Sequence, residues 1–382
     1  MKITDVETFV VPPRWLFCRI ATDEGVVGWG EPIIEGRAAT VRAAVHELSD
    51  YLIGADPLLI ERHWQTLTKG GFYRGGPILS SAVAGIDQAL WDIAGKVHGV
   101  PVHELLGGAV RDRARVYAWV GGDSPADVAE QASAQLEAGF SAIKMNASAA
   151  MTAIDTPART AEVIRRAESV REVLGDDNDL ALDFHGRMSK AMARRVLPAL
   201  EHVNPLFVEE PVLAEYSRDL AGIVAATTIP LATGERLYSR WDFRDVLPTG
   251  IAVIQPDISH AGGISELRRI AAMAEVWDVS LAPHCPLGPI ALASSLQVAF
   301  ATPNFLIQEQ GIAIHYNGGG DDVLDYLIEA SPFRFVDGYA SRPTGPGLGI
   351  EIDEAAVRRA ADVGHRWRSP LWAHPDGSLA EW

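Results

Sequence analysis

The feature that most constrains the fold of this chain is a series of short apolar runs that each end in an acidic residue. Three of these runs end in Asp183, Glu209 and Glu235, at intervals of 26 residues. A buried parallel strand, followed by a helix that returns to the same end, takes roughly this many residues. Three carboxylates at neighbouring strand ends would not all stay ionised without a cation, and Mg²⁺ is the usual partner. The spacing therefore predicts a metal site.

The same interval continues beyond these three residues with different chemistry. Asp257, His284 and Glu309 follow at steps of 22, 27 and 25 residues. Two further apolar runs begin near residues 116 and 142, so the pattern predicts eight parallel strands that close a barrel. No clear amphipathic helix follows the eighth strand. In such barrels the active site lies at the C-terminal strand ends, where all six residues fall. The alternative is that these are surface acids that fall near strand ends by chance, but chance explains poorly why six reactive side chains each close an apolar run.

The segments on either side of the barrel predict a second domain. Residues 3–11, 15–21 and 26–29 have strand patterns, and residues 38–52, 59–67 and 79–98 have helical periodicity. We therefore expect an α/β chain: a modified TIM (β/α)8-type barrel, (β/α)7β, with an N-terminal α+β capping domain. The expected limits are residues 1–112 for the cap, joined by the C-terminal segment 330–382, and residues 113–329 for the barrel. The Trp-rich tail is expected to pack as a surface clasp.

Composition excludes several kinds of partner. With 33 basic and 50 acidic side chains, the net charge of −17 disfavours nucleic acid and anionic membranes. Cys18 and Cys285 are the only cysteines, so we expect no disulfide scaffold and a cytoplasmic location. The first residues lack a signal-peptide pattern, and no apolar run approaches a membrane span. Because neighbours on a strand point to opposite faces, Cys285 is read as a buried hydrophobe rather than a nucleophile paired with His284.

The residues at the strand ends suggest separate roles. Asp183 and His185 are two positions apart, so in an extended chain both would point the same way, one to a metal and one to a substrate. Asp257 and His284 lie on adjacent predicted strands, and a carboxylate bonded to an imidazole fixes its tautomer and raises its basicity. Glu309, if protonated, could donate a hydrogen bond to a substrate carboxylate; the alternative is an ordinary barrel-end acid.

Substrate-binding residues are harder to read from the sequence. Arg14 and Arg74 lie in loops rich in Gly, Pro and aromatic residues, and either could bind an anion, although most such loops are simply turns. Asn146 and His315 lie on other loops that would border the pocket. We take these four as candidates for contacts with the substrate.

Several motifs resemble the enolase superfamily, mandelate racemase group, over nearly the whole chain. They are Glu24-Gly25-Val26-Val27-Gly28-Trp29-Gly30-Glu31, Phe72-Tyr73-Arg74-Gly75-Gly76-Pro77, Asp183-Phe184-His185-Gly186-Arg187, Phe207-Val208-Glu209-Glu210-Pro211, Gln255-Pro256-Asp257, Ser259-His260-Ala261-Gly262-Gly263 and Ala282-Pro283-His284-Cys285-Pro286-Leu287-Gly288-Pro289.

The resemblance implies roles for the residues that match. It assigns one Mg²⁺ per subunit to Asp183, Glu209 and Glu235, acid and base roles to His185 and His284, a partner role to Asp257 and transition-state stabilisation to Glu309. It also implies a homo-oligomer and an ene-diolate formed by C2 proton removal. The implied reaction is dehydration of an aldonic acid, in which His284 removes the C2 proton and His185 protonates the leaving hydroxyl.

Other functions stay open at this point. A racemase or epimerase of a 2-hydroxy acid would use the same scaffold but needs a base on each face of the carbon. Racemases of this group commonly have a second Lys where this chain has Asn146, which cannot take a proton. A metal-dependent hydrolase and a catalytically silent barrel are alternatives of other classes.

Overall fold

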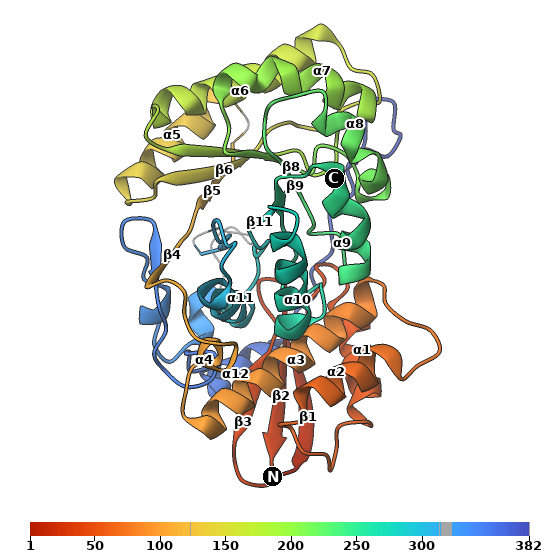
Figure 1. Ribbon diagram of the computed structural model, residues 1–382, viewed down its shortest axis with the longest axis vertical. Helices are drawn as coiled ribbons and strands as arrows, with labels where there is room; N and C mark the ends of the chain where they lie inside the picture. Colours follow the sequence, from red (N-terminus) through yellow and green to blue (C-terminus); the bar gives the residue numbers. More distant parts are fainter. Residues whose placement is uncertain (123, 313, 315–322, 382) are drawn as a thin grey trace.

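The fold is described from a computed structural model that covers residues 1–122, 124–312, 314 and 323–381. His315 and the glycines at 318–320 lie outside these residues. Figure 1 shows a barrel with its surrounding helices in the upper part and a smaller sheet-and-helix unit below it. In the part of the chain that the structure describes, none of the helices combines the length and apolarity needed to span a membrane.

The lower unit begins the chain and has the predicted α+β composition. Its three strands form an antiparallel sheet in the order β1-β2-β3, and its helices pack on one side of that sheet (Figure 1). The elements are β1 (Ile3–Val11), β2 (Trp15–Thr22), β3 (Val27–Gly30), α1 (Ala38–Ser49), α2 (Ile60–Lys69), α3 (Pro77–His98) and α4 (Val102–Leu105).

The barrel consists of seven parallel strands in sequence order, from β5 to β11, alternating with helices. Continuous apolar runs form these strands because helices cover one face and the barrel interior the other. The strands are β5 (Ala118–Val120), β6 (Ala142–Asn146), β7 (Asp179–Asp183), β8 (Phe207–Glu209), β9 (Leu231–Thr233), β10 (Val253–Ile254) and β11 (Ser280–Leu281). The helices are α5 (Pro125–Glu137), α6 (Pro157–Leu174), α7 (Lys190–Leu200), α8 (Leu220–Val224), α9 (Arg240–Val246), α10 (Gly263–Glu275) and α11 (Pro289–Ala301).

The predicted eighth strand is reduced to two isolated bridges. Phe305 pairs with Leu281 and Gln308 pairs with Val116, both in parallel. Hydrogen bonds accompany them, including Gln308 N to the Arg115 carbonyl at 2.9 Å. The ring therefore closes, although this position lacks the ladder of a regular strand.

The barrel interior is packed rather than open. The inner layer combines small side chains such as Ala142, Ala181 and Ala232 with large ones such as Tyr117 and Phe207, and all are buried. A second apolar layer fills the space between the strands and the outer helices. Packing of this kind leaves the strand ends as the place for polar chemistry.

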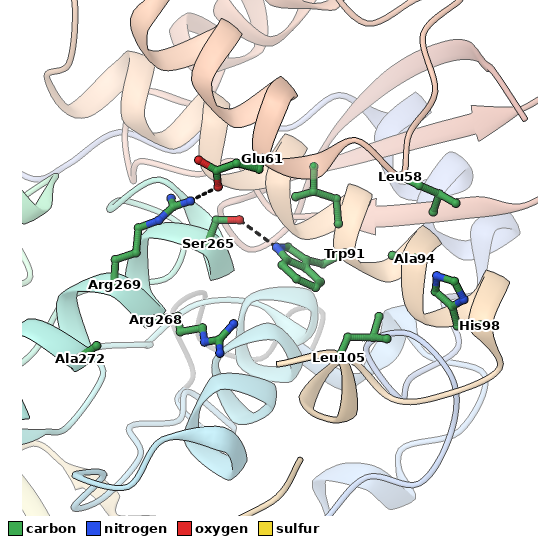
Figure 2. Close-up of a pocket in the computed structure, with 11 residues that line it drawn as sticks. Leu58, Glu61, Trp91, Ala94, His98, Leu105, Ser265, Arg268, Arg269 and Ala272 are labelled. Atoms are coloured by element: carbon green, nitrogen blue, oxygen red, sulfur yellow. Dashed lines mark hydrogen bonds and ion pairs between the residues drawn. The ribbon is translucent and has the colours of Figure 1, made fainter. Parts of the chain in front are cut away.

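The lower unit is joined to the barrel along α3 and α10. Figure 2 shows Trp91 Nε1 donating to Ser265 Oγ, and Glu61 paired with Arg269. The buried Asp87 carboxylate accepts hydrogen bonds from the Ser265 backbone at 2.9 Å and its hydroxyl at 2.6 Å. A cavity of about 550 Å³ lies at this junction. None of the six acid and imidazole groups that end the barrel strands lines it.

Part of the C-terminal segment packs against the lower unit. Strand β12 (Tyr339–Ser341) pairs antiparallel with β4 (Arg113–Arg115). Helix α12 (Glu354–Val363) is joined to β1 and β2 by ion pairs, among them Arg358 with Glu7 at 2.8 Å. Short 3-10 helices complete the described elements: η1 (Glu201–Val203), η2 (Ala214–Asp219), η3 (Leu247–Thr249), η4 (Val323–Tyr326) and η5 (Ser331–Phe333).

Candidate active site

Three carboxylates meet where β7, β8 and β9 end. Asp183 and Glu209 are the last residues of paired strands and face each other in register. Glu235 follows β9 by two residues, after a turn at Gly234 (φ +145°), where a Cβ atom would lie 2.9 Å from Gln255 N. One oxygen of each carboxylate lies within 4.8 Å of the other two. The regular spacing in the sequence thus brings these three residues together.

The electrostatics of this triad suit a divalent cation. Burial, which disfavours the charged form, raises the pKa of Asp183, Glu209 and Glu235 to about 7 each, and repulsion from neighbouring carboxylates adds to the rise. Glu235 Oε2 is buried, with no hydrogen-bond partner among the described residues. Hard oxygen donors in this arrangement are the ligands that Mg²⁺ prefers. The residues present therefore fit a magnesium site.

Lys144, on β6, is a functional candidate that the sequence reading missed. Its Nζ lies 2.9 Å from each oxygen of Glu209, 2.6 Å from Glu309 Oε1 and 3.9 Å from Asp183 Oδ2. Burial alone would lower the pKa of Lys144, but Glu209 and Glu309 outweigh it and raise that pKa well above its usual value. A lysine inside the otherwise apolar strand 142–146 was the available signal.

The predicted pairing of Asp257 with His284 is present. His284 Nδ1 lies 2.7 Å from Asp257 Oδ2. The other oxygen of this carboxylate, Oδ1, accepts a hydrogen bond from Ser259 N at 2.7 Å. His284 Nε2 lies 3.5 Å from Glu235 Oε2 and 3.9 Å from Glu309 Oε2. Burial opposes protonation, yet the Glu235, Glu309 and Asp257 carboxylates raise the pKa of His284 well above its usual value. The imidazole is thus oriented with Nε2 toward the acidic cluster.

His185 also reaches the cluster, but not through the extended backbone that we expected. Strand β7 ends at Asp183, and His185 has a left-handed φ of +48°. Its backbone N–H donates to Asp183 Oδ1 at 2.8 Å, and its Nε2 lies 3.1 Å from Asp183 Oδ2. Burial, followed by the charges of Arg187 and Lys144, lowers the pKa of His185 well below its usual value. The extended geometry was wrong because the chain turns immediately after the strand.

Glu309 lies beside two basic side chains, Lys144 and His284. Burial would raise its pKa, but Lys144 and His284 lower it below the usual value. Its Oε2 accepts a hydrogen bond from the Cys285 backbone at 2.9 Å. To donate a hydrogen bond, as the sequence reading suggested, Glu309 would first have to gain a proton. The Cys285 thiol is buried and has a raised pKa, which agrees with a structural role.

One cavity of about 740 Å³ contains most of the predicted site residues. Arg14 lines it, with Nη2 3.5 Å from Glu35 Oε1. Asn146 lines it too, and its buried Oδ1 has no hydrogen-bond partner among the described residues. Arg74 does not: it is exposed and borders a separate cavity of about 500 Å³. His315 lies outside the described residues.

The sequence reading also missed side chains that complete the pocket wall. His260 Nε2 lies 3.5 Å from Glu35 Oε2, and its Nδ1 lies 3.9 Å from Asp257 Oδ2. His260 belongs to a quoted motif, but nothing in its spacing indicated that it would lie beside Asp257. The tail also contributes to the wall, at Trp367, Arg368, Ser369, Pro370 and Glu381.

Family models match both parts of the chain. Residues 7–107 match the mandelate racemase/muconate lactonizing enzyme N-terminal domain, and residues 127–356 match the enolase C-terminal domain-like model. Two curated relatives, the D-galactonate dehydratases of Ralstonia nicotianae and Pectobacterium atrosepticum, are 55% and 53% identical to this chain, each over 100% of both chains.

Solved structures agree with these matches. An enolase from Agrobacterium radiobacter with bound Na and L-malate has a TM-score of 0.91 and 33% identity, with 100% of both chains covered. A member of the enolase superfamily from Salmonella Typhimurium has a TM-score of 0.86 and 31% identity, covering 94% of this chain and 98% of its own. This chain therefore belongs to the mandelate racemase/muconate lactonizing enzyme family of the enolase superfamily.

Proposed function

We propose that this protein is a Mg²⁺-dependent sugar-acid dehydratase, a hydro-lyase that converts D-galactonate or a close aldonate to the 2-dehydro-3-deoxy acid. The observation that carries the proposal is one cavity lined by His185, His284 and two carboxylates, Asp183 and Glu235, of the buried triad that Glu209 completes. Full-length identity of 53–55% to D-galactonate dehydratases supports the choice of substrate.

Asp183, Glu209 and Glu235 would hold the metal ion, since their oxygens are close together and Glu235 Oε2 has no hydrogen-bond partner among the described residues. When bound, Mg²⁺ supplies positive charge that stabilises negative charge developing on the substrate carboxylate. Lys144, already among these acids, adds a second positive charge at the same end of the pocket. The net charge of the whole protein is negative, so this local field is what admits an anionic substrate.

The two imidazoles would carry out the proton transfers. His284 Nε2 removes the C2 proton, and Asp257 holds the ring and stabilises the imidazolium. His185, whose pKa burial lowers, would first have to gain a proton; it then supplies that proton to the leaving C3 hydroxyl, so that water departs and the resulting enol becomes the keto acid. Each step of this kind contributes about 10² to 10⁴-fold, roughly 3–5 kcal/mol, so electrostatic stabilisation must supply much of the remainder.

Asn146 argues against a racemase on this scaffold. It stands at the end of β6 and lines the cavity, where its amide can bond a hydroxyl but cannot take a proton. A reaction that inverts a carbon needs a base on each face. Dehydration needs one base and one acid, which His284 and His185 supply.

The proposal is tested by following keto-acid formation from D-galactonate with and without EDTA. Metal-dependent keto acid is expected, whereas a racemase, a hydrolase or a silent barrel would give none. His284→Asn should also abolish exchange of the C2 proton in D₂O, and exchange that persists would identify another base. His202→Asn, at an exposed surface pair with Glu168, is the matched control and should exchange normally.

A further inference from the structure

The C-terminal tail, residues 365–381, is part of the catalytic pocket rather than a surface clasp. After α12 the chain leaves the lower unit and runs back to the barrel (Figure 1). Five of its side chains line the same cavity as Asp183, Glu235 and both imidazoles. They bring an aromatic ring, a cation, a hydroxyl and an anion to the wall: Trp367, Arg368, Ser369, Pro370 and Glu381.

The beginning of the tail is fastened to the lower unit. His365 Nε2 lies 2.5 Å from the Pro13 carbonyl, and the Arg14 guanidinium stacks 5.3 Å from the centre of the Trp367 ring. Ser369 packs against Gly36, where the backbone has a φ of +76° and a Cβ atom would lie 2.6 Å from Ser369 Oγ. Contacts this close seat the tail in one position against the loops of the cap.

Further along, the tail is fastened to the barrel. The Trp372 ring stacks over the Arg187 guanidinium at 4.7 Å. Arg187 is two residues beyond His185, on the loop that follows β7, and also bonds the Ser148 carbonyl. The end of the tail folds into a small hairpin, in which Ala373 bridges to Leu379. The tail thus connects the cap to the loop that carries one of the two imidazoles.

We propose that residues 365–381 form the wall of the pocket that contacts the hydroxylated end of the substrate, and that they hold the loop after β7 in place. The inference rests on the proposed function for the identity of the substrate. The carboxylate end of the acid is taken by the triad and Lys144, so the remaining carbons must extend toward other walls. An aromatic ring packs on C–H faces, and charged side chains bond hydroxyl groups, which is the chemistry that Trp367, Arg368 and Glu381 supply.

The test compares a long and a short acid in tail variants of the full chain. Trp367→Ala should raise the KM for D-galactonate at least tenfold while kcat changes less than threefold. Inhibition by D-glycerate, which has only the carboxyl end, should change less than threefold. Trp367→Phe should restore the KM to within threefold. Leu371→Ala, an exposed tail residue that does not line the cavity, is the matched control. An unchanged KM for D-galactonate in Trp367→Ala would overturn the proposal.

A second measurement does not depend on turnover. A chain that ends at Gly364 should exchange its amide hydrogens at residues 183–188 at least tenfold faster than the full chain, because Arg187 loses the Trp372 ring. Unchanged exchange there would refute the role of the tail in holding this loop. If the full chain forms no keto acid from any aldonate, the proposed function fails. The amide exchange at residues 183–188 still decides whether the tail holds the loop after β7.

Discussion

Replacing Asp257 with Asn tests whether the buried carboxylate makes His284 a base. The two side chains are 2.7 Å apart and buried. At an effective dielectric constant of about 20, unit charges about 4 Å apart interact by about 4 kcal/mol. Loss of that charge would lower the pKa of His284, because the Asp257 carboxylate favours the protonated imidazole. We expect the rate of C2 proton exchange to fall by about 10² to 10⁴-fold, or roughly 3–5 kcal/mol in activation free energy.

The assay is NMR detection of deuterium at C2 of D-galactonate in D₂O, which isolates proton removal from loss of water. Ser259→Ala is the matched control, because Asp257 accepts its hydrogen bond from the backbone of Ser259 and not from the hydroxyl. This variant should exchange within about threefold of the unsubstituted protein. An Asp257→Asn variant that exchanges equally fast would refute the assignment of His284 as a base tuned by its carboxylate.

Two predictions concern stability, measured by urea unfolding. Burial raises the pKa of Glu31 to about 8, so the folded state holds a proton that the unfolded state has lost, and the free energy of unfolding should fall as pH rises from about 4.5 to 8. Glu31→Gln should flatten this pH dependence. An unaltered slope of the free energy of unfolding against pH would show that Glu31 is not its source. Glu266→Gln breaks the pair with Arg240 and should cost about 2–4 kcal/mol. Glu162→Gln removes the more exposed pair with Arg159 and should lower the free energy of unfolding by under about 1 kcal/mol. Equal losses in the two variants would contradict the argument that burial makes the difference.

The sequence predicted the convergence of the triad because parallel strands all end at one edge of the sheet. A repeat of 26 residues corresponds to one strand and one helix, so the acids at 183, 209 and 235 come at the same point of three successive units. The dyad of Asp257 and His284 follows from the same geometry on β10 and β11. These residues depend on strand order alone, which periodicity reveals.

Other parts of the site depend on contacts that periodicity does not encode. The turn that places His185 comes after its strand has ended, and it rests on a left-handed residue that an extended pattern does not predict. Lys144 is visible in the sequence as a cation within strand 142–146, but its own strand does not show that three acids from other parts of the barrel surround it. Trp367 lies 182 positions beyond His185 in the sequence and reaches the pocket through stacking on Arg14. Long-range packing of this kind has no local signature.

The cap is built from both ends of the polypeptide, which affects the order in which the molecule can assemble during synthesis. Arg19 joins Glu7 on one side and Glu354 on the other, each at 3.0 Å, so the first sheet and α12 share one ionic network. Translation proceeds from the N-terminus, and domains generally fold as they emerge. The barrel strands leave the ribosome before α12 does, so β1 and β2 must wait for their ionic partners on α12 until the barrel strands have been made.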